Sequence, residues 1–551
     1  MRRIDPANVA PPELRAPNTP KSVVVTLEAA RPFTESDLGI AVRPRPARAA
    51  KHRLVTLGDS LTHGFQSGAI FNTDRSWPAQ VAAAGGFFSS FLHPHYDKYG
   101  GLPLNLEYLV RELQTEVGGD LHDPFTFVRA VLWLHGTLAD ICHYWQDGDG
   151  AIVPKTSKIN HDLATYGYDL RDALSLTPQT IRATIAGTHE NKLVPLVTHG
   201  KERAALRTLP YNDPAQPKTT FPPMSALEAA KRLGAEGIET LTVFLGANNV
   251  LGTTFDLHLA WSDKGYDKLG GTPSAPGKDL YNIWRPEHFA AELALVARAV
   301  RDVGAQHVIW ATVPHVTIVP LLHGIGEKMV RRDRKSRYFP YYSRPWFDKN
   351  TFDPERDPRL TGNDARTIDS AIDQYNDLIA DTVAEARRAG LDWRLLDLCG
   401  VLDRLASRRY IEDAAAQPSW WKDVGGAYPL PPPLAALTPK VDSKFFLSSP
   451  AAGRPGEGTR TQGGLFSLDG VHPTTVAYGI MAHETLRVMR EAGITGYGEI
   501  DFAELLKNDS LLSAPPAGLG EDFAIVGWLD AKIEFATHLF GRAVVPARPS
   551  A

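Results

Sequence analysis

Cysteine is scarce in this chain of 551 residues, which contains only Cys142 and Cys399. Two cysteines are too few for a disulfide framework or for a thiolate zinc site, so we expect both to be small buried apolar side chains. Long hydrophobic runs are also missing. No stretch of about 18 apolar residues occurs, so the sequence predicts no transmembrane segment.

The chain also lacks an excess of charge of either sign. Acidic residues number 63 and basic residues 59, which gives a net charge of -4. This balance offers no electrostatic footprint for nucleic acid, and it favours a small-molecule partner. At the N-terminus, the basic residues of MRRIDPANVA are followed by charge and proline instead of the apolar stretch of a secretory signal. The sequence therefore predicts a cytoplasmic protein.

Composition divides the chain into three parts. Residues 1–50 are rich in Pro, Ala and Arg and are interpreted as an N-terminal arm and linker, residues 51–500 as one catalytic domain, and residues 501–551 as a C-terminal extension. Three regions interrupt the domain. We interpret them as helical and loop insertions at about 86–160, 320–361 and 407–464, with helices expected over 104–117 and 125–145 of the first.

Within the domain, short apolar runs that end in turn residues alternate with segments of helical periodicity. The runs at 53–57, 241–245, 307–313 and 393–398 are typical of buried strands. Helices are expected over about 286–304, 364–388 and 475–491, with Gly390 and Gly493 ending the last two. Such alternation predicts an α/β fold, a three-layer α/β/α sandwich around a central parallel sheet.

The first candidate for chemistry is Ser60, in the segment Gly58-Asp-Ser-Leu-Thr-His-Gly64 directly after the first apolar run. In parallel α/β sheets, ligands bind beyond the carboxyl ends of the strands, so a serine in this turn faces the binding crevice. Gly, Asp and Ser are also ordinary turn and capping residues. The motif therefore indicates a nucleophile only if a base is available to activate it.

A candidate base stands in Asp469-Gly-Val-His472-Pro-Thr474, just before the last expected helix. A serine hydroxyl is a poor nucleophile until an imidazole accepts its proton, and the imidazole needs a carboxylate to fix its tautomer. Asp469 and His472, three positions apart across a turn, can face one cleft together. Alone, such a pair is more often a helix cap and a surface histidine.

These two segments resemble the first and last sequence blocks of the GDSL, or SGNH, hydrolase family. Two further segments resemble the blocks between them: Gly246-Ala-Asn248-Asn249, in which Asn249 stands where family members commonly have Asp, and the segment 162–174 around Gly167. The resemblance implies a flavodoxin-like SGNH fold with Ser60, Asp469 and His472 as the catalytic residues. It implies an oxyanion hole formed by Ser60, Gly167 and Asn248, where preorganised donors can each be worth about 3 to 4 kcal/mol.

The implied activity is hydrolysis of carboxylic esters by an esterase or lipase, through an acyl-enzyme and without a metal or organic cofactor. Two alternatives remain open. An acyltransferase would use the same Ser-His-Asp site and pass the acyl group to an alcohol instead of water. A noncatalytic ligand-binding protein could use the same scaffold, since fold does not imply function.

The sequence contains two hints about the substrate, each with an ordinary structural explanation. The apolar segment Phe125–Trp145 either covers the cleft, which would favour a lipid-like ester, or is plain core. The basic segment Lys328–Arg337 either meets an anionic head group or forms a solvated face.

Overall fold

The structure is a computed structural model, and it describes residues 5–43, 49–117, 124–154, 157–186, 195–210, 221–263, 266, 278–331, 334–347, 349–453 and 457–519. At its centre is a parallel sheet of four strands in the order β1-β5-β6-β12. The strands are β1 (His52–Gly58), β5 (Ile238–Phe244), β6 (His307–Ala311) and β12 (Asp392–Leu396). The four strands expected from the apolar runs are therefore confirmed, and the protein has a mixed α/β fold.

One strand ends earlier than its apolar run. We expected the third strand to continue to Val313, but β6 ends at Ala311. The backbone N–H of Val313 donates to the side chain of Asn376 at 2.7 Å instead of to a neighbouring strand. The side chain of Asn376 thus takes the place of a hydrogen bond to a neighbouring strand, and the chain leaves the sheet at this point.

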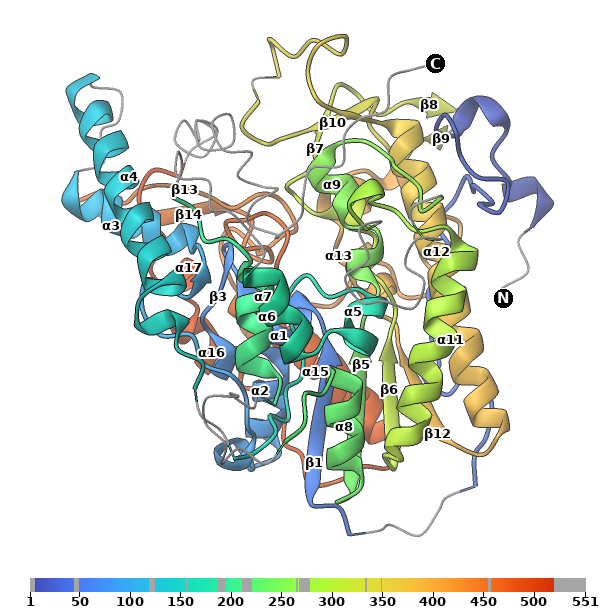
Figure 1. Cartoon of the computed structure of the whole chain (residues 1–551). Coiled ribbons are helices and arrows are strands. Elements are labelled where there is room, and N and C mark those ends of the chain that lie inside the picture. Colours follow the sequence, from blue (N-terminus) through green and yellow to red (C-terminus); the bar gives the residue numbers. More distant parts are fainter. Residues whose placement is uncertain are drawn as a thin grey trace.

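Alternate side chains of the strands point to opposite faces of the sheet. On one face Leu57, Val243 and Trp310 join the large hydrophobic core with helices α8 (Ala226–Gly234) and α11 (Pro286–Val303). On the other face Leu54 and Ile309 join a second cluster with helices α2 (Trp77–Ala84) and α15 (Thr475–Glu491). In Figure 1, α8 and α11 lie in front of the sheet and α15 lies behind it. Helices therefore cover both faces.

The long helices begin and end close to where the sequence predicts. They are α11, α12 (Gly362–Arg388) and α15, and α12 starts with a capping box in which Thr361 and Asp364 bond to each other's backbone N–H. Shorter helices complete the domain: α1 (Ser60–His63), α5 (Leu170–Ser175), α6 (Pro178–Ala186), α7 (Gly200–Thr208), α9 (Gly252–Asp256), α13 (Leu398–Leu405), α16 (Phe502–Asn508) and α17 (Ser510–Ser513).

Chain segments outside the four strands cover both edges of the sheet. Beside β1 runs the segment 162–165, parallel to it, with Leu163 N–H donating to Thr56 O at 2.9 Å and Thr165 N–H to Gly58 O at 3.1 Å. At the other edge Leu395 of β12 donates to the carbonyl of Ser36 in the N-terminal arm. Both edge strands are thereby shielded from further pairing.

The expected insertions contain their own secondary structure. The first holds α3 (Leu106–Glu116) and α4 (Pro124–Gln146), which confirms its two helices. The second holds β7 (His323–Ile325), β8 (Val330–Arg331), β9 (Arg334–Lys335), β10 (Tyr341–Ser343) and β11 (Leu360–Thr361). The third holds η9 (Ser407–Ile411), α14 (Pro432–Ala435), β13 (Leu447–Pro450) and β14 (Gly458–Gln462).

The division into arm, domain and extension stays a prediction, and the part of the extension from residue 520 onwards lies outside the described residues. Among the helices that are described, none has the length and apolar character needed to cross a membrane.

Candidate active site

Three neighbouring chain segments have their carboxyl ends on the same side of the sheet. Each segment is followed by a residue that the sequence analysis singles out. Ser60 follows β1, Gly167 follows the segment 162–165, and Asn248 follows β5. In space, the segment 162–165 lies beside β1 and β1 lies beside β5. Residues far apart in sequence thus converge where the strand order changes direction, which is where open α/β sheets bind ligands.

The turn that carries Ser60 is fixed from several sides. Asp59 caps α1 by accepting the backbone N–H of Leu61 at 3.0 Å, and burial raises the pKa of Asp59 to about 7. A Cβ at Gly58 would lie 2.3 Å from the Thr62 hydroxyl oxygen, so this position requires glycine. Ser60 itself is 5% exposed. The serine therefore stands in a capped, largely buried turn.

Asp469 and His472 form a buried pair. The Nδ1 atom of His472 donates to Oδ2 of Asp469 at 3.0 Å, and the backbone N–H groups of Gly68, Val471 and His472 also donate to this carboxylate at 2.8 to 2.9 Å. Burial alone would raise the pKa of Asp469, but the charge and hydrogen bonds of His472 lower it below its usual value. Because Nδ1 carries the shared proton, Nε2 is the basic nitrogen of the ring.

Ser60 and His472 line the same pocket, a cavity of about 120 Å³. Apart from these two and His315, the lining side chains are apolar. They come mainly from α13 and α15 and from the segments that precede these helices, and include Leu398, Val401, Leu402, Leu405, Ile480 and Met481. The ring of Phe65 packs on the imidazole of His472 with centroids 4.4 Å apart. The candidate nucleophile and base thus share a pocket with a largely apolar lining.

Gly167 and Asn248 are brought together next to this pocket. Asn248 Nδ2 donates to the carbonyl oxygen of Tyr168 at 2.9 Å, which ties the Asn248 side chain to the residue after Gly167. Gly167 has φ +75, a conformation that favours glycine. Neither residue is among those that line the apolar cavity, but Ala247, adjacent to Asn248, is. The candidate oxyanion donors therefore lie at the margin of the pocket.

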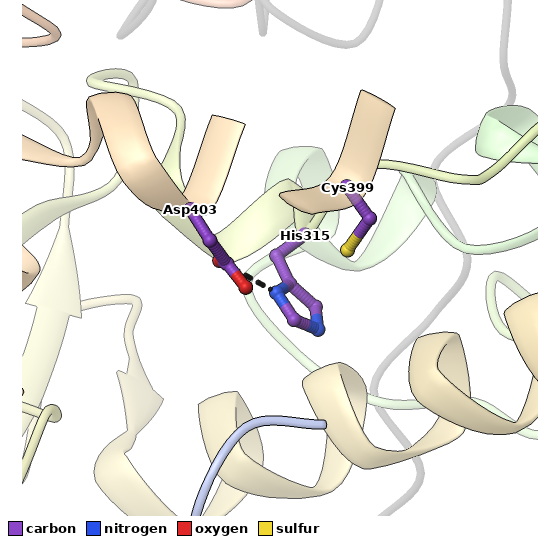
Figure 2. A group of neighbouring side chains, drawn as sticks. All are labelled: His315, Cys399 and Asp403. Atoms are coloured by element: carbon purple, nitrogen blue, oxygen red, sulfur yellow. Dashed lines mark hydrogen bonds and ion pairs between the residues drawn. The ribbon is translucent and has the colours of Figure 1, made fainter. Parts of the chain in front are cut away.

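A second Asp–His pair is formed by Asp403 and His315 (Figure 2), and His315 lines the same pocket. His315 Nδ1 bonds to Asp403 Oδ1 at 2.9 Å, and His315 Nε2 lies 3.5 Å from Asp373 Oδ1. Burial would lower the pKa of His315, but the negative charges of Asp403 and its other neighbours raise it well above its ordinary value. The raised pKa thus favours the protonated form of this ring, which lies between two carboxylates.

His315, Cys399 and Asp403 are the described residues whose ligand atoms lie close enough to hold a metal ion, within 4.8 Å of one another. Burial raises the pKa of the Cys399 thiol to about 12. Thiolate and neutral imidazole are the forms that bind a metal ion, so a metal here would displace a proton from Cys399 and from His315. In this structure His315 and Asp403 form an ion pair.

Of the two interpretations of Phe125–Trp145, the described residues favour plain core. None of the described residues lining the pocket comes from α4, and Leu134, Leu138 and Ile141 belong to the large hydrophobic core. Trp145, for example, is buried against the insertion's own backbone and donates to Gly101 O at 3.0 Å. The apolar wall comes instead from α13. Its signal in the sequence is the spacing of Leu398, Val401, Leu402 and Leu405, which repeats at helical intervals.

The basic segment Lys328–Arg337 is only partly described. Lys328 pairs with Asp413 at 3.2 Å, Arg337 is buried, and the side chains of residues 330–335 lie outside the described set. None of its described residues lines the apolar pocket.

No protein-family model matches the chain, and no curated protein matches it significantly. The function must therefore be inferred from its own residues and their geometry. Ser60, the Asp469–His472 pair and the apolar pocket that Ser60 and His472 share are the features from which that inference starts.

Proposed function

We propose that the protein is a serine hydrolase that cleaves carboxylic esters of apolar acyl groups. The observation that carries this proposal is that Ser60 and the Asp469-bound His472 line one cavity whose other walls are almost wholly apolar. An activated serine needs a neighbouring base with a fixed tautomer. The bond from His472 Nδ1 to Asp469 fixes that tautomer, and three backbone N–H groups hold Asp469 in place. An apolar wall beside the serine suits the hydrocarbon part of an ester.

In the proposed reaction, Ser60 Oγ attacks the ester carbonyl carbon while its proton passes to Nε2 of His472. Asp469 stabilises the resulting imidazolium. The negative charge on the carbonyl oxygen is stabilised by the Ser60 and Gly167 backbone N–H groups and by Asn248. The carbon–oxygen bond to the alcohol then breaks, and His472 gives the proton to the leaving alcohol. Water, deprotonated by His472, attacks the acyl-enzyme and releases the acid, and Ser60 regains its proton.

We also propose that the domain is a three-layer SGNH-type sandwich. With the segment 162–165 counted as the second strand, the sheet order becomes the flavodoxin-like order 2-1-3-4-5. The position of Ser60 after the first strand and of Asn248 after the third matches the reversal point of that order. This topology supports the family resemblance of the sequence blocks.

The test is hydrolysis of p-nitrophenyl esters, from acetyl to long acyl chains, by the wild type and by Ser60→Ala. We expect hydrolysis by the wild type and a loss of about a thousandfold or more in the variant, because the nucleophile is gone. Ser89→Ala is the matched control, since Ser89 is exposed and remote in sequence. It should retain wild-type activity.

Other outcomes have defined meanings. If wild type and Ser60→Ala hydrolyse the esters equally, Ser60 is not the nucleophile. If an alcohol added to the reaction diverts the acyl group from acid to a new ester, the protein is an acyltransferase. If no ester is turned over and no acyl-serine forms, the scaffold binds ligands without catalysis.

A further inference from the structure

A second cavity, of about 190 Å³, lies among β7, η9 and the loops that flank β10. None of the described residues that line it is Asp or Glu. Its lining instead contains five basic side chains: Arg337, Lys349, Arg408, Arg409 and Lys444. We call it the basic pocket. Such a concentration of one charge in a chain of near-zero net charge requires compensation.

Nearby carboxylates neutralise two of these cations. Arg409 Nη1 pairs with Asp369 Oδ2 at 2.7 Å, and Lys444 Nζ pairs with Glu412 Oε1 at 2.9 Å. The other three form no ion pair with any described residue; they are Arg337, Lys349 and Arg408. The basic pocket thus keeps an excess of positive charge.

Two residues that line the basic pocket also carry buried N–H donors without a hydrogen-bond partner in the described chain. Arg337 is 5% exposed, and its Nη1 donates to the Tyr410 hydroxyl at 3.2 Å, but its Nε and Nη2 have no hydrogen-bond partner among the described residues. His323 accepts from Arg408 through Nδ1 at 3.1 Å, so its Nε2 carries a proton, and that atom also has no partner within the described chain. Buried donors left unpaired cost about 1 to 3 kcal/mol each.

A bound anion would satisfy both deficits. The cations and donors come from four separate segments: the start of β7, the loop before β10, the loop after β10, and η9. Donors that converge from several directions suit a tetrahedral oxyanion better than a planar carboxylate, whose two oxygens lie in one plane. We propose that the basic pocket binds a phosphate group, held by Arg337, Arg408, Lys349 and His323.

The basic pocket and the apolar pocket share a wall. In the segment after β6, Val316 and Val319 line the apolar pocket while Thr317 and Ile318 line the basic one. At the end of α13, Leu405 lines the first and Ala406 the second. A phosphate site here adjoins the proposed ester site without containing any of its residues, so it exists independently of the proposed reaction.

The electrostatics of His323 agree with this assignment. Burial, together with the charges of Arg408 and Lys349, lowers the pKa of His323 to about 3. A dianion in the pocket would offset those charges and raise this pKa. The imidazole of His323 is therefore a built-in reporter for occupancy.

The test is calorimetric titration of the full chain with inorganic phosphate at constant ionic strength in chloride. We expect saturable binding at one site, weakened about tenfold or more by Lys349→Gln and by Arg408→Gln, because each removes a charge-assisted hydrogen bond. Lys349 is exposed, so its replacement does not endanger folding. Arg356→Gln, which removes a positive charge elsewhere on the surface, should bind phosphate like the wild type.

Absence of saturable binding at tens of millimolar phosphate, or equal binding by the wild type and both pocket variants, would overturn the proposal. Ser60→Ala should bind phosphate normally, so a failed esterase proposal leaves this result intact. The source of the phosphate can also be separated. If phosphate raises KM for an ester that carries a phosphate group but not for a neutral ester, the pocket holds the substrate's own phosphate; an equal effect on both esters indicates free phosphate.

Discussion

Two histidines line one pocket, and each is bonded through Nδ1 to an aspartate, at 3.0 Å for Asp469–His472 and 2.9 Å for Asp403–His315. They differ in what surrounds them. Around the first pair, three backbone N–H groups donate to the carboxylate beside the imidazole. Around the second, a further carboxylate, Asp373, stands on the Nε2 side of the ring.

This difference decides what each histidine can do. Backbone N–H groups satisfy the charge of Asp469 without adding negative charge near His472, which leaves Nε2 of His472 as the base of the proposed reaction. A carboxylate on each side holds His315 protonated, and a protonated imidazole cannot accept a proton from serine. An Asp–His hydrogen bond alone therefore does not identify a general base.

The largest expected effect is on ester hydrolysis, and it distinguishes the two Asp–His pairs. Asp469→Asn should lower kcat/KM for ester hydrolysis by about a thousandfold or more, because an amide no longer fixes the required tautomer of His472. Asp403→Asn is the matched substitution in the other pair, and its kcat/KM should stay within about tenfold of the wild type, since Asp403 does not line the pocket. Similar losses in both variants would contradict the distinction.

The next effect concerns stability and its dependence on pH. Asp403→Asn should lower the free energy of unfolding by about 3 kcal/mol near neutral pH, because it leaves a buried imidazolium with less compensation. The folded pKa of His315 is raised, so this stabilisation is complete below the unfolded value of about 6.5 and is lost as the pH rises through the folded value.

Asp469 should show the opposite dependence on pH. Its folded pKa is lowered, so its contribution is complete above the unfolded value of about 3.9 and is lost as the pH falls through the folded value. Denaturant unfolding of the wild type and both Asn variants, measured across the pH range, tests both signs. If the wild-type advantage over Asp403→Asn persists unchanged at alkaline pH, His315 is not an imidazolium.

The smallest expected effect tests whether the apolar wall of the pocket binds the acyl group. Leu402→Trp should fill part of the cavity and reduce hydrolysis of longer acyl esters relative to acetyl ester, since each buried methylene contributes at most about 0.8 kcal/mol. Leu295→Trp, at an exposed position on α11, is the control. An unchanged chain-length profile in Leu402→Trp would mean that the acyl group binds elsewhere.

Much of the fold follows from the sequence because apolar runs and helical periodicity are local signals. The four strands and the helices α11, α12 and α15 form where these patterns predict them. The end of β6 does not follow from its own residues, because Asn376, more than sixty positions away, captures the N–H of Val313. Edge coverage by the N-terminal arm likewise depends on long-range contacts.

The site was predictable only in part. Ser60, Asp469 and His472 stand in short motifs at the ends of expected elements, where residue type and position carry information. The wall of α13 was missed because an apolar helical stripe does not reveal whether it packs on core or lines a cavity. The pair His315–Asp403 was missed because its members are 88 positions apart and neither belongs to a strong motif.

The most direct test of the central claim is covalent labelling by a serine-reactive phosphonate, followed by mapping of the modified peptide and measurement of the labelling rate. The account predicts one adduct, on Ser60, and labelling at least about a hundredfold slower in His472→Ala than in Asp403→Asn, because His472 and not His315 activates the serine. An adduct on another residue, or equal rates in the two variants, would contradict it.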